Sequence, residues 1–172
     1  MENTTMNNDL DDELKALEIT AMNEKAENAV AVAVAATATT GAIPIPFADA
    51  PLLIAEQVTL MGTICGIYKI DVKKDGLKML AVSALGAGGA TVVGKTIATN
   101  LIKLIPGAGS IAGGVISAGT AGVVTLAMGK AFINVCKLVK VGKLSEEDLL
   151  SSKGKALLKD EFKKQLKNSK KK

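Results

Sequence analysis

An uncharged stretch from Leu104 to Gly129, bounded by a lysine on each side, limits what this chain can fold into more than any other part of it. The stretch is about 26 residues long, whereas a helix needs roughly 20 residues to cross the hydrocarbon core of a bilayer. The Pro106-Gly107 pair near its start shortens the usable helix. The stretch therefore predicts a long apolar helix that is surrounded either by lipid or by other helices of the protein.

Small residues recur at a spacing of four along this stretch. Those that we expect to pack against other helices are Gly109, Gly113, Gly114, Ala118 and Gly122. Residues four apart lie on one helix face, where missing side chains let a second backbone approach closely. Because only 2% of the residues are aromatic, close approach rather than bulky side chains is expected to hold the helices together.

Hydrophobic periodicity predicts an all-α fold with four helices in the first 141 residues. They run from Asp9 to about Thr40, from an Asp49 N-cap to about Tyr68, from near Gly76 to about Leu104, and from about Ser110 to Val141 with Gly142 as its cap. Pro44 and Pro46 form the turn after the first helix and Pro106 the turn after the third, because proline lacks the N–H that a helix requires. We expect two proline-turned hairpins that form a small, membrane-embedded bundle.

The two ends of the chain carry opposite charge. Residues 1–28 hold eight acidic residues against two lysines, and residues 130–172 hold thirteen lysines against five acidic residues. The chain is therefore divided into an acidic N-terminal segment (1–28), an apolar four-helix hairpin domain (29–141) and a basic C-terminal segment (142–172).

Both end segments have the spacing of amphipathic helices. The N-terminal stripe consists of Leu10, Leu14, Leu17 and Ala21, and the C-terminal stripe of Leu158, Phe162 and Leu166. Ser145 is expected to cap the start of a helix, since Asp148 follows three residues later as in a capping box.

Lysines cluster on one side of the predicted hairpins, in the loop around residues 69–78 and in the basic tail. The positive-inside rule then places both termini in the cytoplasm, with the hairpins in a bacterial inner membrane. Glu56 and Lys95 oppose this arrangement, because a charge within a span costs roughly 2.5 to 3.5 kcal/mol. They would offset one another as an intramembrane pair, or they mark helices of a bundle that stays in the cytoplasm.

The residue types exclude several kinds of chemistry. The chain has no histidine, which excludes Ser-His-Asp and Cys-His catalysis. Cys65 and Cys136 lack metal-ligand or redox spacing and are expected to be buried free thiols. We therefore expect no enzyme activity, no catalytic residues, no cofactor and no metal site.

Residues 89–96, G-A-T-V-V-G-K-T, match the P-loop pattern in which Lys95 would reach phosphates and Thr96 would hold magnesium. The surrounding Ala- and Gly-rich sequence favours a helix, and no alternating strands and helices follow to form a parallel sheet. Nucleotide binding at this stretch is therefore the least favoured of the functions considered.

The basic tail also lacks the features of a nucleic-acid site. It has no arginine and a single aromatic residue, Phe162, so base stacking has little support. We expect its lysines to lie near an anionic lipid leaflet, and a purely solubilising role is the alternative.

Residues 40–140 resemble an uncharacterised bacterial domain that occurs alone or C-terminal to Era-like, ribosome-binding-type GTPase domains. The resemblance is carried by G-A-I-P-I-P-F-A-D-A-P-L-L-I-A-E-Q-V-T-L-M, by L-I-P-G-A-G-S-I-A-G-G and by A-G-V-V-T-L-A-M-G-K-A-F-I. It implies an α-helical, membrane-associated module with no assigned activity and no catalytic residues. Since no GTPase domain is present in this sequence, it also implies a GTPase partner supplied in trans.

The sequence thus favours a non-enzymatic helical membrane protein that anchors or scaffolds a partner and self-associates through its small-residue faces. A soluble or inducibly inserting helical protein that perturbs bilayers is the alternative.

Overall fold

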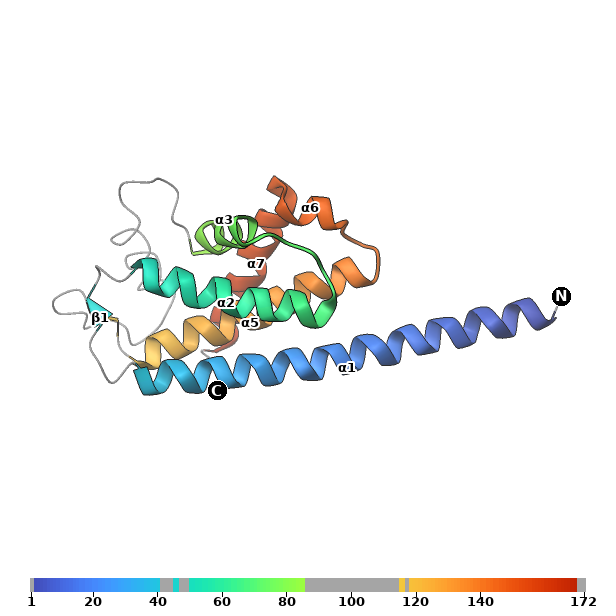
Figure 1. Ribbon diagram of the computed structural model, residues 1–172, viewed down its shortest axis with the longest axis horizontal. Helices are drawn as coiled ribbons and strands as arrows, with labels where there is room; N and C mark the ends of the chain where they lie inside the picture. Colours follow the sequence, from blue (N-terminus) through green and yellow to red (C-terminus); the bar gives the residue numbers. More distant parts are fainter. Residues whose placement is uncertain (1, 41–44, 47–49, 86–114, 117, 170–172) are drawn as a thin grey trace.

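The computed structural model describes residues 2–40, 45–46, 50–85, 115–116 and 118–169, with side chains described over 9–37, 53–85 and 121–169. These residues form six helices and one pair of two-residue strands (Figure 1). The elements are α1 (Glu2–Thr40), β1 (Ile45–Pro46), α2 (Ala50–Tyr68), α3 (Lys74–Ala84), β2 (Val115–Ile116), α5 (Ala118–Lys140), α6 (Glu146–Leu150) and α7 (Ser152–Asn168). The predicted all-α class is confirmed for this part of the chain.

Helix α5 lies at the centre of the bundle and packs against α1, α2 and α7. Its side chains are apolar around most of its circumference, and Val124, Met128 and Phe132 are fully buried. A helix that is apolar all round must be covered, and here other helices cover much of it. The core of the described structure is therefore assembled around α5.

Helix α1 is a single continuous helix that is longer than predicted. It begins at Glu2 rather than Asp9, and it continues past residue 28, the proposed segment boundary. The alternating valines from Val30 to Val34 lie within it, which confirms the prediction of a helix over a strand. Its N-terminal end extends beyond the rest of the bundle (Figure 1), and we call residues 9–18 the α1 arm.

The arm leaves its predicted apolar stripe uncovered. Leu10, Leu14 and Leu17 are 53%, 62% and 61% exposed, whereas Met22, Ala26 and Val30 further along α1 are buried. Among the α1 residues whose side chains are described, it is thus the second half that contributes to the core.

The predicted start of the fourth helix near Ser110 is wrong. Val115 and Ile116 form strand β2, which pairs antiparallel with β1 by setting Ile116 opposite Ile45 and Val115 opposite Pro46. The β-branched pair suits an extended backbone, and the partner strand lies about 70 residues earlier in the chain. The helix consequently begins at Ala118.

The helices of the first predicted hairpin pack against each other with opposite directions, α1 ending at Thr40 and α2 beginning at Ala50 (Figure 1), whereas Pro44 lies outside the described residues. The second predicted hairpin falls mainly on residues 86–114, including Pro106, which lie outside the described residues.

The end of α5 forms as predicted, because Gly142 has a φ of 72° that favours glycine. Its N–H donates to the Val139 carbonyl at 3.0 Å, and the Lys143 N–H donates to the Leu138 carbonyl at 2.9 Å. This pair of bonds is the Schellman arrangement that closes a helix C-terminus.

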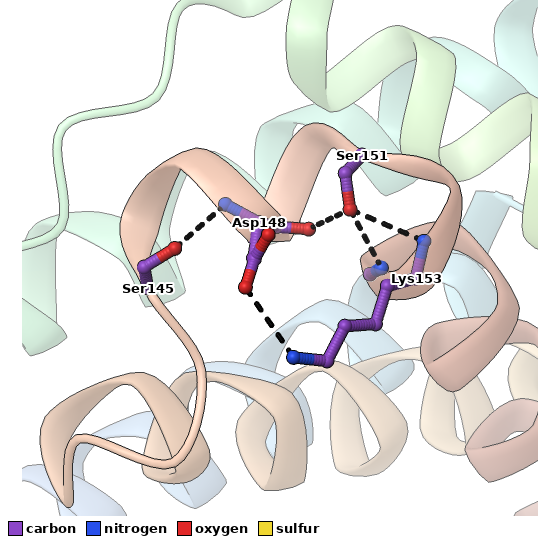
Figure 2. Close-up of polar contacts among 5 residues, drawn as sticks. Ser145, Asp148, Ser151 and Lys153 are labelled. Atoms are coloured by element: carbon purple, nitrogen blue, oxygen red, sulfur yellow. Dashed lines mark hydrogen bonds and ion pairs between the residues drawn. The ribbon is translucent and has the colours of Figure 1, made fainter.

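Hydrogen bonds made by Ser145 and Ser151 shape the turns between α5 and α7 (Figure 2). The predicted Ser145 cap is confirmed, since its Oγ accepts from the Asp148 N–H at 3.0 Å. Ser151 Oγ donates to the Asp148 carbonyl at 2.7 Å and accepts from the Lys153 N–H at 3.1 Å, which ends α6 and starts α7. The turn lets α7 lay Leu158, Phe162 and Leu166 onto the core, which confirms the predicted stripe.

Val30 of α1 closely approaches α5 at Gly129, which yields the first prediction. A Cβ atom at Gly129 would collide with Val30 Cγ2 and lie 2.8 Å from its Cγ1. Valine is stiff at χ1, so the helices must separate, and Gly129→Ala should lower the free energy of unfolding by about 1 to 3 kcal/mol in urea denaturation.

The matched control is Gly122→Ala on the same helix, where the added Cβ would meet Val34 Cγ1 at an ordinary 3.8 Å. It should be neutral or stabilising by up to about 1 kcal/mol. Adding Val30→Ala to Gly129→Ala should recover part of the loss. Equal effects of the two glycine substitutions would contradict the proposed close approach.

Candidate functional site

Helices α1, α2 and α5 surround an open groove of about 590 Å³. It is lined by small residues of α1 and α2 (Ala29, Ala33, Ala36, Ala55, Thr59 and Thr63) together with Glu56 and Thr125. Val32, Thr37 and Leu60 complete the lining, so alanines and threonines make up most of it and few large side chains project into the space between the helices.

Glu56 is the charged residue among those that line this groove. Its carboxyl is partly buried, and burial raises its pKa. Lys95, its predicted intramembrane partner, lies outside the described residues. The Glu56–Lys95 pair therefore stays a prediction. The described part of the site is the Glu56 carboxyl group, which lies beside mainly small and apolar side chains of α1 and α2.

A buried polar contact lies between α2 and α5. Gln57 is fully buried, and its Nε2 donates to Thr125 Oγ1 at 3.1 Å. Its Oε1 accepts no hydrogen bond from the part of the chain that the structure describes. Sequence reasoning did not identify this contact as a site, although a glutamine inside an otherwise apolar helix is the signal that could have pointed to it.

A second groove, of about 700 Å³, lies where the α1 arm meets the end of α5. Charged side chains line it, among them Asp12, Glu18 and Lys140. Glu18 is paired with Lys69 at 2.9 Å, and the hydrogen bond from Lys69 lowers the pKa of the Glu18 carboxyl. This exposed pair joins the base of the arm to the end of α2.

The two cysteines are buried and free, as predicted. The neighbouring Cys65 of α2, together with burial, raises the pKa of the Cys136 thiol of α5 well above its ordinary range, whereas the contact with Cys136 lowers the pKa of the Cys65 thiol. Nearby, burial raises the pKa of Tyr68 to about 12. Because the Cys136 thiol and the Tyr68 hydroxyl stay protonated at neutral pH, and all three side chains are buried, they act as core residues. Among the described residues, no three Cys, Asp or Glu side chains group together to hold a metal ion.

Most of the predicted site residues lie outside the part of the chain that the structure describes. Gly109, Gly113, Gly114, Pro44, Pro106 and the P-loop-like residues 89–96 lie outside the described residues. Pro46 lies in β1 and Ala118 is the first residue of α5. Gly122 lies on α5 near Val34 of α1. The helix-packing role of this set remains a prediction.

Sequence reasoning overlooked Gly129, the glycine with the closest contact to α1. Its position seven residues after Gly122 puts both on the same side of α5, which is the signal that could have identified it.

The chain was compared with known families and proteins. The model of the family described as a domain of unknown function, DUF697, matches residues 6–169. The chain belongs to this family. The comparisons with curated proteins and with solved structures gave no match. Membership in DUF697 agrees with the resemblance to an uncharacterised helical domain noted from the sequence, and it assigns no activity.

Glu56 gives a prediction about pH. Because its folded-state pKa is raised, the folded protein binds this proton more tightly than the unfolded chain does. Stability should therefore fall as pH rises from the ordinary glutamate pKa of about 4.3 through the raised pKa, and then level off. Glu56→Gln should raise the melting temperature at about pH 7 and lose this advantage at about pH 3.

Glu24→Gln, at an exposed position of α1, makes the same change in net charge and should leave the melting temperature nearly unchanged. A Glu56→Gln variant that gains nothing at neutral pH would contradict the unfavourable burial of the carboxylate.

The Gln57–Thr125 contact gives a prediction about stability. Thr125→Val keeps the shape but leaves Gln57 Nε2 without its acceptor, which should cost about 1 to 3 kcal/mol. Replacing both partners, as Gln57→Met with Thr125→Val, should recover most of that loss, because no buried polar group is then left unpaired. Chemical denaturation of the two single variants and the double variant measures the coupling, and additive losses would show that the hydrogen bond contributes little.

Proposed function

We propose that this protein is a non-enzymatic helical scaffold that binds the surface of a membrane and holds a protein partner there. The observation that carries the proposal is the packing of α7. Its apolar residues face α5, while Lys159, Lys163 and Lys167 form an exposed row about 100° further around the helix. A fixed row of cations on a folded bundle is suited to an anionic leaflet, where each lysine near the surface contributes about 1 kcal/mol.

Surface binding fits the packing better than embedding of the whole bundle. Helix α7 is attached to α5 by its apolar stripe and by a hydrogen bond from Asn134 Nδ2 to Glu161 Oε2 of 2.9 Å. If α5 crossed the bilayer with α7 still in place, several lysines would enter hydrocarbon at roughly 2.5 to 3.5 kcal/mol each. Membrane contact by the folded bundle therefore favours the headgroup region.

One observation favours inducible insertion as a second candidate. Ala121–Lys140 of α5 is long and apolar enough to cross a membrane by length and composition, and 56% of that span is buried inside the bundle. Inserting it would require α1 and α7 to separate from α5. A protein that perturbs bilayers by inserting α5 would therefore have to open this bundle first.

The partner class is proposed from the sequence resemblance, which implies a GTPase in trans. Crosslinking of the full chain in cells, followed by mass spectrometry, is expected to recover a GTPase. Repeated recovery of partners without a nucleotide-binding domain would contradict this part of the proposal.

The membrane proposal predicts the outcome of vesicle flotation. The full chain should float with vesicles that contain phosphatidylserine and not with vesicles of phosphatidylcholine alone. Replacing Lys159, Lys163 and Lys167 by glutamine removes about 3 kcal/mol of attraction and should weaken binding by about a hundredfold.

The matched control replaces Lys73, Lys74 and Lys78, three exposed lysines at the start of α3 and within it, and should retain binding. Carbonate washing should release the protein from vesicles. Retention after carbonate, or leakage of a trapped dye, would contradict surface binding and support insertion of α5.

A further inference from the structure

Helix α1 has two distinct apolar faces, one in the arm and one in the part that is packed in the core. At 3.6 residues per turn, the exposed stripe of Leu10, Leu14 and Leu17 lies about 150° around the helix from the buried row of Met22, Ala26 and Val30. Because the stripe faces away from the buried row, the bundle that covers one face does not cover the other. The stripe is a second surface, presented outward by a helix whose continuation is packed in the core.

The stripe has the spacing of a coiled-coil seam. Leu10, Leu14, Leu17 and Ala21 follow one another at intervals of four, three and four residues, which corresponds to d, a, d and a positions of a heptad. All four side chains are exposed in the structure. A continuous helix therefore presents this seam before any partner binds, so little ordering is required on association.

The charges beside the seam select the partner. The e positions are Asp11 and Glu18, of which Glu18 is also paired with Lys69, and the g position directly before Leu14 is Glu13. Residues at e and g face the e and g residues of a paired helix. In a second copy of this chain, acidic residues would meet acidic residues in either orientation, which disfavours self-pairing.

The same charges disfavour a membrane as the ligand of the stripe. Residues 9–18 hold five acidic residues and one lysine, so an anionic leaflet would repel the arm. An apolar seam between rows of acidic residues is complementary to a helix with leucines at its seam and basic residues on either side.

We infer that the leucine stripe of the α1 arm binds a basic amphipathic helix of another protein by forming a short two-stranded coiled coil. The inference rests on the scaffolding half of the proposed function, since it names the chemistry of the partner, and it is independent of the membrane half. A failure of vesicle binding would leave it intact, and its own failure would leave lipid binding by α7 intact.

The test uses the full chain and a fluorescent designed peptide that forms an amphipathic helix with leucine at a and d and lysine at e and g. A matched peptide carries glutamate at e and g. Fluorescence anisotropy should show binding of the lysine peptide and none of the glutamate peptide. Leu14→Ser with Leu17→Ser should weaken binding of the lysine peptide by about tenfold or more.

Two further variants make the result specific. Met79→Ser changes an exposed apolar residue of α3 and should leave the affinity unchanged. Asp11→Lys with Glu13→Lys should shift the preference toward the glutamate peptide. All variants should melt at the temperature of the parent chain, because the substituted side chains are exposed.

Three outcomes would overturn the inference. The first is binding of the lysine peptide that survives loss of both leucines, which would reduce it to charge attraction. The second is a dimer in sedimentation equilibrium that the leucine substitutions dissociate, which would make the stripe a contact between copies. The third is binding to anionic vesicles that requires the stripe.

Discussion

The structure depends on the burial of α5. An apolar helix of this length must be covered, and full burial of each large side chain contributes roughly 1.5 to 3 kcal/mol. Val124, Met128 and Phe132 are buried in a bundle in which α1 and α7, from the two ends of the chain, pack on α5 together with α2. The acidic and basic ends of the sequence therefore belong to one core with the apolar middle, and the charges that distinguish them lie on the outer sides of the helices.

Small residues and polar residues set how closely the covering helices approach. Gly129 lets Val30 of α1 approach the α5 backbone, whereas the groove beside α2 stays open because alanines and threonines line it. In that groove, burial disfavours the charged form of the Glu56 carboxyl. The adjacent Gln57 is fully buried and donates a hydrogen bond to Thr125. The bundle thus combines one tightly packed interface with one incompletely filled interface around the same central helix.

Local signals predicted much of this fold. The Gly142 cap, the Ser145 cap and the Leu158–Phe162–Leu166 stripe depend on residues within a few positions of one another, and all three formed as predicted. The start of α5 was missed because Val115 and Ile116 are held by a strand far away in the sequence. Contacts such as Gly129 with Val30 and Gln57 with Thr125 join different helices, so periodicity within one helix could not identify them. Periodicity found the leucine stripe of α1, but it could not indicate that the smaller residues on the other face would be the buried ones.

The β1–β2 pair also has a consequence for synthesis on the ribosome. It joins Ile45 to Ile116, and the central helix follows only after that second strand. While the chain is being made, the sides of α1 and α2 that α5 covers in the folded bundle lack that cover until more than half of the protein has emerged, because contacts so distant in sequence form late.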